Sequence, residues 1–192
     1  MADPGMTSDR DAQKLFQQFI AQHDGPAYLR RARRLNDAIA ALHERCRKQR
    51  EEWLLMPRLH LGRLRALAGV WENLRPLVHD DAQLAQLERC HAELEPKLRL
   101  PLDPTTSARQ LRQGLRAVLE SNRRFNDRWR NYIRCLDFTE VNALIDGYNR
   151  YYLVEKECVV SSPRIARMGF VPRQPIGPEE LFAAWPLLPV WA

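Results

Sequence analysis

The sequence predicts an all-α fold, an antiparallel helical bundle of five or six helices followed by a proline-rich C-terminal arm. Two long segments keep apolar residues at alternating spacings of three and four positions, the pattern of helices that pack along a seam. Segments with the alternation of half-buried strands are almost absent. Six of the thirteen prolines fall in the last thirty residues. We therefore divide the chain into a bundle over 1–160 and an arm over 161–192, which we expect to be docked.

The N-terminal part of the chain predicts three helices. Residues 8–24 form the first, with Ser8 or Asp9 as its cap. The second covers 27–55 and ends because the residue before a proline avoids the helical region. A third helix begins near Pro57 and continues until Pro76 ends or kinks it.

The middle of the chain predicts a short helix and a long one. The short helix begins at Asp80 or Asp81 and ends before Pro96, and three prolines make residues 96–106 a semi-rigid linker. The long helix covers 108–135, capped by Thr106 or Ser107. Its apolar seam is interrupted by one polar residue, Asn122, which can fix the register of packed helices. We expect 27–55 and 108–135 to be the two longest helices.

A sixth helix begins at Asp137 or Thr139 and ends at Ser161. In the arm, only residues 178–185 have a helical pattern, with Pro178 in the first turn. The chain then closes on PLLPVWA, which holds no charged side chain. A free tail is usually polar, so we expect this one to dock on its own bundle or on a partner.

The charge balance favours an anionic partner. Thirty basic residues against twenty-four acidic ones give a net charge of +6, and all but four of the basic residues are arginine. Arginine suits phosphate and carboxylate because its planar fork donates several hydrogen bonds. The alternative is a coding bias that raises arginine, alanine, leucine and proline together.

No signal peptide or membrane-spanning segment is evident, so we expect a cytoplasmic protein with reduced cysteines and no membrane partner.

Motifs for catalysis and cofactors are missing, so we expect no cofactor and no enzyme activity, although an enzyme stays open as a third class. Neither a phosphate-binding glycine loop nor an HExxH motif occurs. Glu88 and His91 form one ExxH pair, whereas a helical di-iron site needs two. His43 and Cys46 have a spacing that suits zinc, but no second pair accompanies them. We interpret these residues as parts of packed helices.

The clearest positive feature is residues 122–134, which hold five arginines, three aromatics and three asparagines. The arginines can contact nucleic-acid phosphates. The aromatics occupy the seam, so we expect them in the core rather than as a base-stacking platform. A second cluster, RRARR at 30–34, gives either a phosphate-tracking stripe or a solvated face with salt bridges. The predicted nucleic-acid-binding residues are Arg30, Arg31, Arg33, Arg34, Arg45, Arg47, Arg116, Arg123, Arg124, Arg128, Arg130 and Arg134.

These observations favour a non-enzymatic accessory protein that binds the phosphate backbone of DNA or RNA. The alternative is a protein–protein adaptor or scaffold subunit of a larger assembly. It would use the aromatic helix at 139–158 and the apolar tail, with Tyr148, Tyr151, Trp185 and Trp191 as its contact residues. Rings on all sides of the 139–158 helix imply either burial on several sides or a face that meets a partner.

Overall fold

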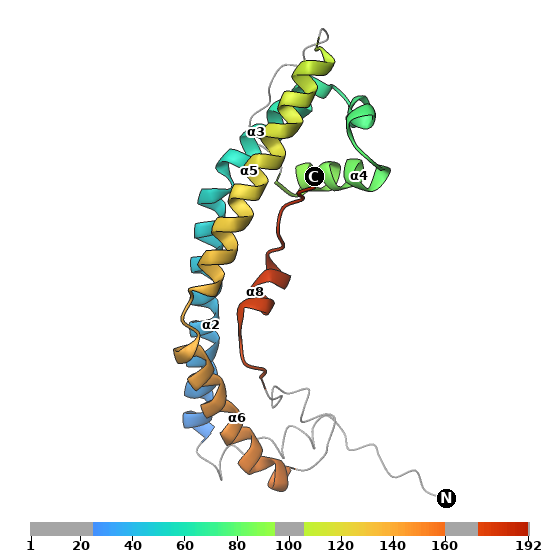
Figure 1. Cartoon of the computed structure of the whole chain (residues 1–192). Helices are drawn as coiled ribbons and strands as arrows, with labels where there is room; N and C mark the ends of the chain where they lie inside the picture. Colours follow the sequence, from blue (N-terminus) through green and yellow to red (C-terminus); the bar gives the residue numbers. More distant parts are fainter. Residues whose placement is uncertain (1–24, 95–105, 160–172, 192) are drawn as a thin grey trace, which may run out of the picture. The chain divides into compact units, whose positions relative to one another are not determined.

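The computed structural model describes residues 25–94, 106–159 and 173–191. All regular elements in these ranges are helical, which confirms the all-α class (Figure 1). None of the described helices is long and apolar enough to cross a membrane. The predicted helix at 8–24, most of the predicted linker at 96–106, and the predicted helix end at Ser161 lie outside the described residues.

The chain divides into two compact units. The first unit comprises residues 1–44 and 137–177, and the second comprises residues 45–136 and 178–192. Helix α2, Gly25–Trp53, contributes to both, whereas the other helices belong to one unit each. All five tryptophans fall in the second unit, which makes their fluorescence a reporter of that unit alone.

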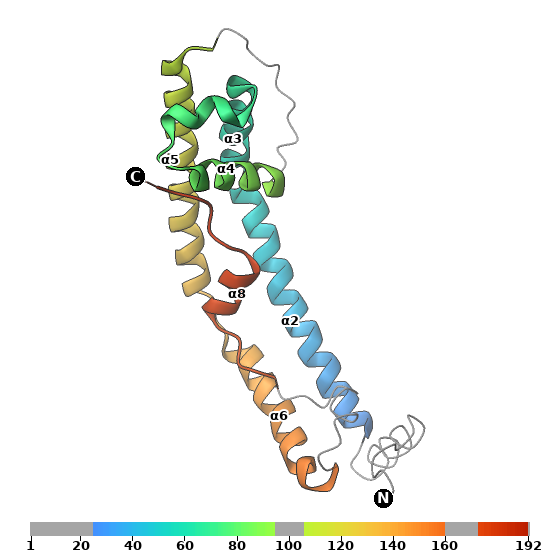
Figure 2. The same ribbon diagram turned by 90° about the vertical axis from the view of Figure 1, so that its right-hand side faces the viewer.

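The central pair of the second unit is α3, Leu55–Ala68, and α5, Ala108–Arg134, which run side by side (Figures 1 and 2). Helix α2 leads into α3 through one turn at Leu54, whose amide donates to the Arg50 carbonyl at 2.9 Å. Pro57 lies in the first turn of α3, where it removes no intrahelical hydrogen bond. The predicted long helices are confirmed as the two longest described, with 29 and 27 residues.

Helix α3 ends earlier than the sequence predicts. It stops at Ala68 because Gly69 adopts a positive φ of 70°, a conformation that glycine takes without steric cost. Residues Trp71–Leu77 then form a separate 3-10 helix, η1, which contains Pro76. The prediction of one helix from Pro57 to Pro76 is therefore wrong, because a glycine inside a helical pattern can also end the helix.

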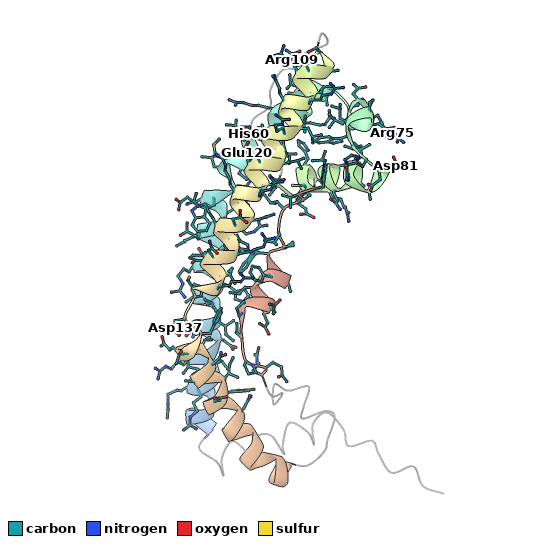
Figure 3. The ribbon with its side chains drawn as sticks, viewed as in Figure 1. His60, Arg75, Asp81, Arg109, Glu120 and Asp137 are labelled. Carbon is teal, nitrogen blue, oxygen red and sulfur yellow. The ribbon has the colours of Figure 1, made fainter. Side chains whose placement is uncertain are left out.

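Helix α4, Asp81–Leu94, packs with η1 against α3. Asp80 accepts a hydrogen bond from the Gln83 amide at 2.8 Å and so caps the helix. Arg75 of η1 bonds Asp81 at 2.9 Å, and Figure 3 labels both residues where η1 meets α4. The surface ion pair adds little stability, so the buried leucines of α4 hold it in place.

Helix α5 begins as the sequence predicts. Ser107 is its N-cap and forms a capping box with Gln110, in which each side chain accepts from the other's backbone amide. The buried face of α5 carries Val118, Phe125 and Trp129, each 2% exposed or less. Removing these side chains from water is the main stabilising contribution of the helix.

The first unit contains the N-terminal part of α2 and helix α6, Thr139–Val159. Two asparagines of α6 hold the extended chain that follows the undescribed residues 160–172. Asn142 bonds both the amide and the carbonyl of Ile176, at 2.8 and 2.9 Å. Asn149 bonds both groups of Arg173, at 2.7 and 2.8 Å. An asparagine side chain can satisfy both backbone groups of one residue because it carries a donor and an acceptor.

The last described segment begins with helix α8, Pro178–Ala184, which packs on α5 in the second unit. Pro178 is the first helical residue, as expected. Leu181 of α8 and Leu188 of the following extended chain are buried, at 0% and 6% exposure. Figure 2 shows α8 and this chain beside α5. We call residues 185–191 the tail.

Candidate functional site

A groove of about 810 Å³ lies along α5 in the second unit. Pockets that take drug-sized ligands have volumes of about 300–1,000 Å³. Four arginines of α5 line this groove, together with η1, the histidine that follows it, and the end of the tail. Its lining residues are Pro76, Leu77, His79, Arg112, Leu115, Arg116, Leu119, Glu120, Arg123, Arg124, Asp127 and Trp191. We call it the arginine groove.

Three arginines of the groove are free to meet an anion. Arg112, Arg116 and Arg123 follow each other at spacings of four and seven residues, which places them on one face of α5. All three side chains are exposed. Within the described ranges none of them has an acidic partner. The two acidic residues that also line the groove, Glu120 and Asp127, pair with Arg124 and Arg130 instead, so the groove keeps a net positive charge.

The other predicted arginines of α5 have contacts on the helix itself or with a ring. Arg124 pairs with Glu120 one turn away, and Arg130 bonds Asp127 at 3.3 Å. The guanidinium of Arg128 lies 4.4 Å from the centre of the Trp53 ring, a cation–π distance. Arg134 is exposed at the end of the helix. Only part of the arginine face predicted from the sequence is thus available to a ligand.

The aromatic residues between these arginines belong to the core, as expected. Phe125 and Trp129 are 2% and 0% exposed. Tyr132 is half-buried, and its ring meets the Trp53 ring edge-on at 5.5 Å. Phe125 and Trp129 therefore have no open face for a base, whereas Tyr132 stacks on Trp129 and keeps part of its surface exposed.

The face of α5 that adjoins the arginine groove holds the tail through its backbone. Asn126 bonds both the amide and the carbonyl of Leu188, each at 2.9 Å. Asn122 donates to the carbonyl of Pro189 at 3.0 Å. Both asparagines are 1% exposed, so these bonds satisfy groups that water does not reach.

A tryptophan completes this attachment at the start of the tail. The indole N–H of Trp129 donates to the carbonyl of Trp185 at 3.3 Å, and the two rings meet edge-on. The sequence identified Asn122 as a polar exception in the seam but missed Asn126. The available signal was a second asparagine one helical turn later, next to an apolar seam.

Arg50 of α2 also contacts the tail. It donates to the carbonyl of Pro186 at 3.0 Å, and its guanidinium lies 5.5 Å from the centre of the Phe125 ring. Burial lowers the pKa of this guanidinium from its ordinary value. Arg50 thus helps to hold the tail.

The predicted cluster on α2 is exposed but is divided between the units. Arg30, Arg31, Arg33 and Arg34 belong to the first unit, while Arg45 and Arg47 belong to the second, and all six side chains are exposed. The arginine groove belongs to the second unit. The cluster at 30–34 and the arginine groove are therefore basic surfaces of different units.

The residues predicted for a protein partner occupy different environments. Tyr148 is 4% exposed, and the side chain of Tyr151 lies outside the described residues. Trp185 is half-buried with its ring against Trp129, and Trp191 is half-buried at the arginine groove. Of the three whose side chains are described, Trp191 alone lines the groove.

The thiols and histidines of the described ranges form no metal site. No group of three or more metal-binding side chains occurs there. Cys46 and Cys90 are buried, and burial raises the pKa of both thiols, that of Cys90 to about 12. A thiol with so high a pKa is neither a good nucleophile nor a ready metal ligand. His91, the histidine of the ExxH pair, packs edge-on against Trp71 at 5.4 Å.

No protein-family model, curated protein sequence or solved structure matches the chain. Function is therefore inferred from the chemistry of the arginine groove.

Proposed function

We propose that this protein is a non-enzymatic, basic helical accessory protein that binds the phosphate backbone of nucleic acid through the arginine groove. The observation that carries the proposal is the set Arg112, Arg116 and Arg123, three exposed guanidinium groups on one face of α5. The described ranges give none of them an acidic partner. Contacts between arginine and phosphate supply much of the affinity of nucleic-acid-binding proteins.

The length of the arginine row suits an extended polyanion better than a small anion. Arg112 and Arg123 are eleven residues apart on a continuous helix, which corresponds to about 16 Å along its axis. A duplex of that length carries about ten phosphate charges, so a row of this length can reach several phosphates at once. Phosphate contacts carry no sequence information directly, and the proposal is therefore for binding without strong sequence preference.

The basic cluster at 30–34 supplies further phosphate contacts in this proposal. Its arginines are exposed, like those of the groove. If both surfaces together neutralise about five phosphates, the logarithm of the association constant should fall against the logarithm of the salt concentration with a slope of about −3.5 to −4.5. Replacing Arg30, Arg31, Arg33 and Arg34 with glutamine should make that slope shallower. It should also lower the affinity for nucleic acids of every sequence to the same extent.

The decisive experiment replaces the three groove arginines with glutamine in R112Q/R116Q/R123Q. Binding to DNA and RNA is measured by fluorescence anisotropy over a salt series. We expect the slope to become shallower by roughly 2–3, because each neutralised phosphate contributes about 0.7–0.9. The matched control is R63Q, since Arg63 is an exposed arginine of α3 that does not line the groove. An unchanged slope and affinity in the triple variant would refute the groove as the phosphate-binding surface.

The adaptor hypothesis predicts a different result in the same assay. Nucleic-acid binding by the unmodified protein would be weak and insensitive to salt. Substitution of Tyr151 or Trp191 would instead abolish a protein contact, whereas Tyr148, predicted with them, is buried in the core. The salt series therefore separates the two functions before any partner is known.

A further inference from the structure

The tail places one aromatic side chain at the edge of the arginine groove. Asn126 fixes both backbone groups of Leu188, and Asn122 fixes the carbonyl of Pro189. Trp191 follows two residues later and lines the groove that Arg116 and Arg123 also line. It is half-buried, so part of its indole surface remains exposed. Phe125 and Trp129 of α5 are closed to a ligand, but this ring at the groove is not.

We propose that the ligand of the arginine groove is single-stranded nucleic acid, with one base stacked on Trp191 and the phosphates on the arginines of α5. The inference rests on the proposed function and names its substrate class. Proteins that bind single strands combine a positive groove for the backbone with aromatic side chains for the bases. The arginine groove has both components, from two segments that are far apart in the sequence.

The two components discriminate between single and double strands. In a duplex the base faces are stacked on one another, so a tryptophan at a groove edge gains nothing from them. In a single strand each base exposes a π-face that a tryptophan can cover, whatever the base. Arginines alone favour the duplex, because its charge density is higher. Preference for a single strand must therefore come from Trp191.

The asparagines act as positioning residues in this arrangement, because they touch the tail and not the ligand. Their bonds go to the backbone of Leu188 and Pro189, which directly precede Val190 and Trp191. Without them the tail loses the bonds that set where Trp191 lies. Loss of Asn122 and Asn126 should thus reproduce the binding defect of losing Trp191, with the ring itself still present.

The test compares two single strands with one duplex on the full-length protein. The probes are an oligothymidine and an oligouridine of about twelve nucleotides, which lies within the site sizes of single-strand binders, and a mixed-sequence DNA duplex. For W191A we expect affinity for the single strands to fall about 5- to 150-fold, the effect of losing one stacked base. Duplex affinity should not change. If W191A loses the same affinity for the DNA strand and the RNA strand, the preference for single strands comes from base stacking. If the two losses differ, the larger loss identifies the strand whose base stacks on Trp191.

Three further variants separate stacking from a structural role of the ring. W191F keeps an aromatic face and should retain most of the single-strand affinity, whereas N122A/N126A should behave like W191A. V190A is the matched control, because Val190 is the exposed neighbour of Trp191. Quenching of tryptophan fluorescence by the single strands should diminish in W191F. Unchanged quenching in W191F would contradict stacking on Trp191.

The outcomes also distinguish this inference from the proposed function. Equal affinity of the unmodified protein for duplex and single strand, or an equal loss of both in W191A, would overturn the single-strand inference alone. In that case R112Q/R116Q/R123Q would still have a lower affinity for all three probes than the unmodified protein. If this arginine variant binds all three probes as tightly as the unmodified protein, the proposed function itself is refuted.

Discussion

Removing the amide of Asn126 tests whether its two hydrogen bonds attach the tail to α5. Asn126→Ala deletes the donor to the Leu188 carbonyl and the acceptor from the Leu188 amide, both at 2.9 Å. A net hydrogen bond contributes about 0.5–1.5 kcal/mol, so the pair is worth about 1–3 kcal/mol of unfolding free energy. Asn126 is 1% exposed and Leu188 is 6% exposed, so water cannot replace these bonds while the tail stays docked. If the tail detaches in N126A, the loss of unfolding free energy cannot exceed the free energy with which the tail docks on α5.

Urea denaturation followed by tryptophan fluorescence is the suitable assay, because all five tryptophans belong to the second unit. Asn131→Ala is the matched control, since Asn131 is an exposed asparagine of the same helix. We expect the midpoint of N126A to fall clearly below that of N131A. Equal midpoints would refute the view that the buried amide anchors the tail. The slope of unfolding free energy against urea concentration scales with the surface that unfolding exposes. A lower slope in N126A would therefore show that the tail is already released in the folded state.

Three other predictions concern local features of the second unit. Ser107→Ala removes the capping box of α5 and should cost about 0.5–2 kcal/mol of unfolding free energy, measured by the same denaturation. Trp129→Phe deletes the donor to the Trp185 carbonyl, which by itself should cost about 1 kcal/mol, and it also removes buried ring volume. The hydrogen-bond part of the loss should be smaller when N126A in α5 has already released the tail. Cys135 is exposed and should react with iodoacetamide near pH 8 well before Cys90, whose pKa of about 12 leaves almost no thiolate; peptide mass spectrometry reads both sites. Equal labelling rates would contradict the buried position of Cys90.

The sequence accounts for most of the helices because their signals are local. Ser107 and Gln110 are three residues apart, and Pro57 and Pro178 each act within one turn, so caps and helix starts can be inferred from adjacent residues. The burial of Phe125 and Trp129 also follows from spacing, because residues on one helical face share an environment. The end of α3 at Gly69 did not follow, since a glycine inside a helical pattern is compatible with both continuation and a stop.

The sequence by itself determined an all-α protein with a basic balance, arginine-rich faces and an apolar end. Tertiary structure alone decided which arginines remain unpaired and where the tail lies. Asn126 and Leu188 are 62 residues apart, and no periodicity relates them. Hydrogen bonds between such distant residues depend on the path of the whole chain, because an amide side chain bonds any backbone group that folding brings within reach. The arginine groove exists for the same reason, since α5, η1 and the tail meet there only in the folded protein.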